Sequence, residues 1–170
     1  MKNFEDLLKG GDLRSIGKAN VIVKEVTNQS DFDALFMGLF HTDRKVVMRT
    51  ADAIEKITLT KPMLLNNHKK EVLELFFSAK HIELKWHLAL LVSRLTLTSA
   101  ETGKVWHYLT DWATNKKESK IVRVNSVQSL FNLLQKNMEL KQDFDQTIDR
   151  ITIENIPSIN ARIKKIKNVL

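Results

Sequence analysis

The chain has 170 residues, of which 43% are hydrophobic, so it is long and apolar enough to bury a sizeable core and is not expected to be disordered. It contains no cysteine, which excludes disulfides, thiolate zinc sites and cysteine nucleophiles. Its formal net charge of +7 at pH 7 suits nucleic acid, anionic lipid or an acidic protein as a partner, and it equally suits plain solubility.

Glycine and proline are scarce, with five and two residues respectively, so long helices with short connections are predicted rather than an all-β fold. The first ten residues contain acidic side chains and no apolar stretch, unlike a signal peptide. No uncharged run approaches the ~20 apolar residues of a membrane span. We therefore expect a cytoplasmic protein with no membrane span.

Amphipathic segments of two kinds alternate along the chain. Segments of the first kind lie at 31–40, 71–79, 102–114 and 140–151, after a shortened one that contains Phe4, Leu7 and Leu8. Segments of the second kind align with one another without gaps, at 17–22, 48–53, 86–91, 122–127 and 161–166. The alternation predicts about five helical hairpins, within the ~40-residue period of helical repeats.

The aligned segments share one basic or potentially basic position, here called x, which is occupied by Lys18, Arg49, His87, Arg123 and Arg162. Counted from x, the positions x+1, x+4 and x+8 hold no charged residue in any segment. Steps of three and four residues return to one helix face. Each segment is therefore predicted to bury x+1, x+4 and x+8, with x on the flank of that stripe.

Local signals mark several helix starts. Thr98 and Ser99 precede Glu101 in the pattern of a capping box, and Asp31 is expected to cap the helix that it opens. Pro157 suits the first turn of the last helix. That basic last segment, 158–170, is interpreted as a terminal helix packed on the previous repeat, while a free helix of this kind suits a membrane surface or a partner.

Two stretches, Asp-Arg-Lys-Val-Val-Met-Arg-Thr-Ala-Asp-Ala-Ile at 43–54 and Lys-Ile-Val-Arg-Val-Asn at 120–125, resemble the HEAT repeat family in its bacterial HEAT-like form. The resemblance implies an all-α fold, a right-handed α–α superhelix of the HEAT/armadillo type, as one repeat domain over 1–170. It also implies a non-catalytic scaffold that binds a partner on its inner, concave face. A distant likeness to HEAT-like alkylpurine DNA glycosylases makes nucleic acid the alternative partner.

The x position supports two readings. Equivalent positions stack in a repeat array, so the five side chains are expected to form one row that suits a phosphate backbone or an acidic strip. The same side chains can instead pair with carboxylates in their own or the next repeat, such as Asp12 and Asp43, each six residues before x, or Glu25 and Asp52. Ligand binding and internal pairing both remain open at this point.

The tryptophans have separate expectations. Trp86 lies in an apolar column of the alignment and is expected in the core. Trp106 and Trp112 are six residues apart on one helix, so they cannot both point one way, and one of them is a candidate aromatic contact with a partner.

No catalytic set of residues emerges from the sequence. Glu83 and His87 have helical spacing but lack the third ligand of a zinc site, and nucleotide-binding or Gly-x-Ser-x-Gly motifs are missing. We therefore predict no metal, no cofactor and no enzymatic activity. The expected function is a non-catalytic scaffold whose basic second-helix face binds a protein or another acidic ligand. The alternative is a nucleic-acid-binding protein related to the glycosylases.

Overall fold

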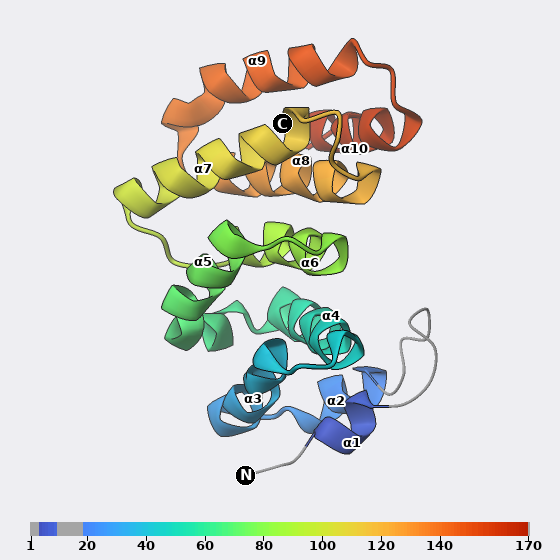
Figure 1. Cartoon of the computed structure of the whole chain (residues 1–170). Coiled ribbons are helices and arrows are strands. Elements are labelled where there is room, and N and C mark those ends of the chain that lie inside the picture. The colour runs from blue at the N-terminus through green and yellow to red at the C-terminus, as the bar shows by residue number, and fades with distance from the viewer. Residues whose placement is uncertain (1–3, 10–18, 170) are drawn as a thin grey trace. The chain divides into compact units, whose positions relative to one another are not determined.

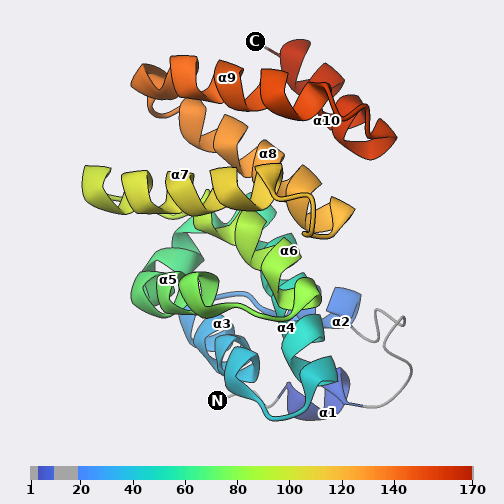
Figure 2. The same ribbon diagram turned by 45° about the horizontal axis from the view of Figure 1, so that its top comes forward.

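The computed structural model describes residues 4–9 and 19–169, and within these ranges every regular element is a helix. The chain divides into two compact units, Met1–Lys70 and Glu71–Leu170. Helices that are neighbours in the sequence run back and forth within each unit (Figures 1 and 2). The predicted all-α architecture of helical hairpins is confirmed, while the single domain over 1–170 stays a prediction.

The first unit contains α1 (Glu5–Leu8), α2 (Ala19–Glu25), α3 (Gln29–Phe36), η1 (Met37–Phe40), α4 (Arg44–Thr60) and η2 (Pro62–His68), where η denotes a 3-10 helix. Helix α4 is its centre, because it packs against α1, α2, α3, η1 and η2. The segment predicted at 31–40 is thus split into an α-helix and a 3-10 helix. The cap of α3 is Asn28 rather than Asp31, whose carboxylate instead accepts from the Thr27 backbone and hydroxyl.

The second unit begins inside α5 and contains α5 (Lys69–Ser78), α6 (Ile82–Val92), α7 (Ser99–Thr114), α8 (Lys120–Leu134), η3 (Met138–Leu140), α9 (Lys141–Thr152) and α10 (Pro157–Lys167). Helix α8 is central here and packs against α6, α7, α9 and α10. The second helices α6, α8 and α10 lie side by side, and α7 lies next to α9 (Figure 1). None of the helices in the two described ranges is long and apolar enough to cross a membrane.

Polar side chains cap the N-termini of α7 and α8 in the second unit. The Thr98 hydroxyl accepts the Glu101 backbone N–H, and the Glu101 carboxylate accepts the Thr98 N–H, which forms the predicted capping box of α7. The Ser119 hydroxyl caps α8, and Pro157 occupies the first turn of α10 as predicted. The Thr98 and Ser119 hydroxyls accept backbone N–H groups of the first turn, which have no acceptor within the helix, and Pro157 has no N–H group to satisfy.

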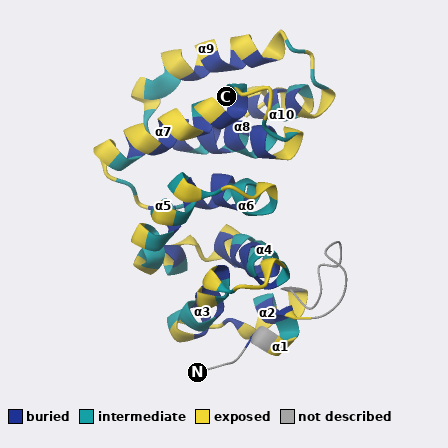
Figure 3. Cartoon of the chain, viewed as in Figure 1, coloured by how far each residue is buried: buried dark blue, intermediate teal, exposed yellow. Residues whose placement is uncertain are grey.

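Buried residues follow the inner faces of the helices (Figure 3), and at x+1 Thr50, Leu88 and Ile163 are buried whereas Val124 is half-buried. Every x+4 side chain is buried, namely Ile22, Ala53, Leu91, Val127 and Ile166. At x+8 the four described residues are buried as well, namely Val26, Ile57, Leu95 and Phe131, and Leu170 lies outside the described residues. Because each large aliphatic side chain that leaves water contributes about 1.5–3 kcal/mol, these columns are a main source of stability in both units.

Candidate functional site

The structure places the members of the x position in different surroundings. Lys18 lies outside the described residues, Arg49 belongs to α4 in the first unit, and the remaining three belong to the second unit. Arg49 is almost fully buried, and its Nη1 donates to the Leu8 carbonyl oxygen at 2.6 Å. This contact ties α4 to the end of α1.

Arg123 is only 2% exposed and has three hydrogen bonds. Its Nε donates to the Ala113 carbonyl oxygen at 2.8 Å, and Nη1 and Nη2 donate to the two carboxylate oxygens of Glu154 at 3.0 and 2.9 Å. The hydrogen bonds from Arg123 hold the pKa of Glu154 below its usual value, although burial opposes the effect. Arg123 therefore joins α7, α8 and the turn between α9 and α10.

His87 and Arg162 complete the x position. His87 is buried, and its ring lies 5.5 Å from the ring of Trp86, centroid to centroid; Trp86 itself is half-buried and not in the core as predicted. Arg162 is half-buried, and its Nη1 donates to Gln128 Oε1 at 2.8 Å. Arg49, Arg123 and Arg162 thus have hydrogen-bond partners within the protein, and ligand binding at the x position stays a prediction.

The indole rings of Trp106 and Trp112 are both buried. Trp106 donates its ring N–H to the Asp143 carboxylate. Trp112 packs against Phe76 at 4.7 Å between ring centroids, and the Lys85 ammonium lies 5.1 Å from its ring. The exposed aromatic side chain of this helix is Tyr108, which the sequence reasoning did not single out.

A ladder of polar side chains joins the second helices of the second unit. From α8, Asn125 donates to the Trp86 carbonyl oxygen at 2.9 Å, and the Ser129 hydroxyl donates to that of Ala89. Further along α8, Asn132 donates to the Ser93 hydroxyl oxygen at 3.2 Å. The sequence signal for this ladder is the set of uncharged polar residues inside the otherwise apolar run 124–135.

Charge is distributed unevenly in the second unit. Helices α8 and α10 contain no acidic residue, and their basic residues are Lys120, Arg123, Arg162, Lys164, Lys165 and Lys167. The four lysines of this set are exposed, and none forms an ion pair with another residue in the described part of the chain. Helix α9 presents exposed Asp143, Asp145 and Asp149.

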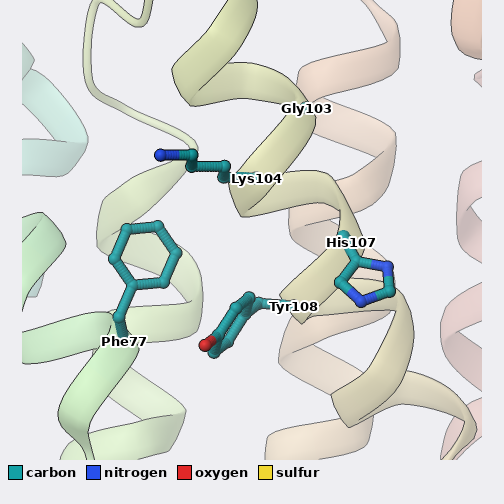
Figure 4. Close-up of a pocket in the computed structure, with 5 residues that line it drawn as sticks. All are labelled: Phe77, Gly103, Lys104, His107 and Tyr108. Carbon is teal, nitrogen blue, oxygen red and sulfur yellow. The ribbon is translucent and has the colours of Figure 1, made fainter.

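An open hollow of about 570 Å³ lies between α5 and α7 on the side of the first helices. It is lined by Phe77, Gly103, Lys104, His107 and Tyr108 (Figure 4). The four residues of α7 are spaced so that they share one helix face. The rings of Phe77 and Tyr108 contact each other edge to face in the lining of the hollow, with ring centroids 4.8 Å apart and ring planes at 67°.

The histidines do not assemble a metal site in the described residues. In the first unit, His68 stacks on Phe36 at 3.9 Å, and its Nε2 lies 2.7 Å from Asp33 Oδ1. A hydrogen bond from Gln29, together with His68, lowers the pKa of Asp33. Across residues 4–9 and 19–169, no group of three or more histidine and acidic side chains is arranged to hold a metal ion.

Comparison with known proteins bears on the repeat architecture. The family model of the HEAT repeat domain matches residues 11–170. Neither a curated protein nor a solved structure matches the chain significantly. The match supports a repeat scaffold of the kind that mediates binding, and the likeness to DNA glycosylases stays a prediction. Because the hairpins recur in both units and the match spans nearly all of the sequence, the chain belongs to the HEAT repeat domain family.

Proposed function

We propose that this HEAT repeat protein is a non-catalytic scaffold and that the second helices of its second unit bind an acidic segment of a partner protein. The observation that carries the proposal is the set of exposed lysines on two neighbouring helices without acidic residues, Lys120, Lys164, Lys165 and Lys167. A carboxylate-rich segment is complementary in charge to these lysines. Opposite charges on two binding surfaces raise the rate of association and set the orientation of the partner.

The packing beneath these lysines favours a rigid platform. The buried Arg123–Glu154 pair connects α8 to the α9–α10 turn, and the Asn125, Ser129 and Asn132 side chains connect α8 to α6 and its C-terminal cap. A surface that is already ordered before binding loses less conformational entropy when the partner docks. The interior contacts therefore support the binding role without themselves meeting the ligand.

Nucleic acid is the second candidate, because exposed lysines also suit phosphates. The net charge of +7 overstates the attraction, since two of the cations, Arg49 and Arg123, are buried and hydrogen-bonded inside the protein. A protein that neutralises about four phosphates loses affinity for duplex DNA with a log–log salt slope of roughly −4. A titration of a fluorescent duplex from low to physiological salt separates the two candidates.

The test of the proposal uses a displayed library of random peptides selected against the full chain. We expect the enriched peptides to be rich in aspartate and glutamate, and Lys164→Glu with Lys165→Glu to weaken their binding at least about tenfold. The matched control is Lys80→Glu with Lys117→Glu, which makes the same charge change at exposed positions between helices. Equal binding by both double variants, with melting curves that show intact folds, refutes the proposal.

A further inference from the structure

The hollow between α5 and α7 has walls that are held in place by the core beneath them. Phe76 is buried and packs against Trp112 at 4.7 Å, and it also contacts both Phe77 and Tyr108, at 5.3 and 6.0 Å between ring centroids. The rings of Phe77 and Tyr108 are thus braced from inside while part of each faces solvent; Tyr108 is 39% exposed. Braced aromatic side chains provide contact area at low entropic cost.

Gly103 forms part of the lining and has no packing reason to be glycine. A Cβ atom added there meets no other atom within 4 Å, whereas a Cβ at Gly38 would lie 2.4 Å from Thr50 Oγ1. Gly38 is therefore explained by the close approach of α4, and Gly103 is not explained by any neighbour. Glycine weakens a helix interior, and one reason to keep it is the close approach of a ligand to the bare backbone.

The polar groups around the hollow favour an anion. Lys104 is exposed and forms no ion pair or hydrogen bond with another residue that the structure describes. His107 is paired with Asp111, with His107 Nε2 3.4 Å from Asp111 Oδ2, so that carboxylate is turned to the histidine. In Figure 4 the Lys104 side chain extends over the Phe77 side of the hollow, whereas His107 lies at the opposite edge. One cation beside two aromatic rings complements a ligand that combines an apolar group with a carboxylate.

We propose that this hollow binds a short segment of a partner protein in which an aromatic or large aliphatic side chain stands close to an aspartate or glutamate. The apolar side chain packs on the wall that Phe77 and Tyr108 form together, beside the backbone at Gly103, and the carboxylate pairs with Lys104. The volume of about 570 Å³ falls within the range of ligand pockets, and its open form suits a segment that continues along the surface. The site is separate from the lysines of α8 and α10.

The experiment selects a displayed random peptide library on the full chain and measures the affinity of the enriched peptides by fluorescence anisotropy. A class of peptides with an apolar residue within two positions of an acidic one is expected. A Cβ at Gly103 meets no other atom within 4 Å, so Gly103→Trp places an indole in the hollow and should weaken this class at least about tenfold. Gln146→Trp, at an exposed position of α9, is the matched control and should leave the affinity unchanged.

Two further variants make the outcome decisive. Lys104→Glu should weaken the same peptides even if Gly103→Trp fails to fold, and Lys164→Glu with Lys165→Glu should leave them unchanged. The proposal is overturned if no such class is enriched, or if its affinity is insensitive to Gly103→Trp and Lys104→Glu. It is also overturned if 3-phenylpropionate shifts the NMR signals of residues 103–108 while no peptide does, because the hollow is then a small-molecule site.

Discussion

The pair of Arg123 and Glu154 offers the sharpest test of how the second unit is held together. Removing one partner of a buried pair costs about 3–5 kcal/mol when both charges are out of water. Glu154 is 14% exposed and regains some water when its partner is removed, so we expect Arg123→Met to lower the free energy of unfolding by about 2–3 kcal/mol. Glu154→Leu should cost more, about 3–5 kcal/mol, because it leaves a guanidinium that is 2% exposed without its carboxylate.

The double variant Arg123→Met with Glu154→Leu separates charge from packing. Replacing both partners of a buried pair with apolar residues of similar size is often neutral, so its cost should fall below the sum of the two single variants by about 2 kcal/mol. Tryptophan fluorescence during urea unfolding measures all four proteins. It reports on the second unit, since Trp86, Trp106 and Trp112 are the three tryptophans of the chain and all lie there.

Acid should remove the contribution of this pair. The hydrogen bonds from Arg123 lower the pKa of Glu154 in the folded protein, and the charges of Lys116 and Arg150 act in the same direction. The stabilisation is therefore complete above the unfolded-state pKa of about 4.3 and is lost as the pH falls through the lower folded-state pKa. The difference between the wild type and Glu154→Gln should narrow from pH 6 to pH 3. Additive losses in the double variant, together with a difference that does not change with pH, would refute this account.

Four other substitutions test local features by the same unfolding measurements. Gly103→Ala should raise the free energy of unfolding by about 1 kcal/mol, because the position is open and alanine favours helix. Gly38→Ala should lower the free energy of unfolding by about 1–3 kcal/mol, because the new methyl group clashes with Thr50. A gain in stability at Gly38 together with a loss at Gly103 would contradict the packing described. Ser129→Ala should cost about 1 kcal/mol by removing a buried hydrogen bond between α8 and α6. Thr98→Ala should cost about 1 kcal/mol by removing the cap of α7, and an unchanged midpoint would count against the capping box.

The fold was largely predictable because burial in a helix follows a local period. The columns at x+4 and x+8 follow from the alignment of the five segments and from helical spacing, and their described members are buried. Helix starts were predictable where the side chain bonds a backbone group three residues away, as at Thr98. The start of α3 was misplaced because Asn28 and Asp31 are both good capping residues, and the sequence does not rank them.

The partners of the x side chains were not predictable in the same way. We expect a carboxylate of the same or the next repeat as the partner, but the pattern that suggests Asp12 and Asp43 six residues before x does not extend to Arg123, where that position is Lys117. The carboxylate that Arg123 contacts belongs to Glu154, 31 residues later, in the turn between the next two helices. A contact at that separation depends on how adjacent hairpins pack, which the spacing of residues within one helix does not determine.

The hollow was missed for a different reason, since nothing in its residue types is unusual. The available signal was Gly103 inside an amphipathic helical stretch, where glycine is costly and usually has a packing reason. The space around the two positions distinguishes them. At Gly38 a Cβ atom would clash with Thr50, whereas at Gly103 it would meet no other atom. Because no atom of the protein needs the room at Gly103, the proposed peptide site accounts for a glycine that packing does not explain.

Charge follows the same logic as glycine, because its meaning depends on where the side chain lies. Arg49 and Arg123 contribute to the net charge of the chain, but both are buried and hydrogen-bonded to other parts of their own units. Lys164 and Lys165 contribute equally to the net charge and are exposed on a helix without acidic residues. In this repeat protein, some basic side chains therefore connect helices inside the structure, and others are exposed to solvent. The proposed recognition surface consists of the second group, so we expect variants of the first group to change stability and variants of the second to change binding.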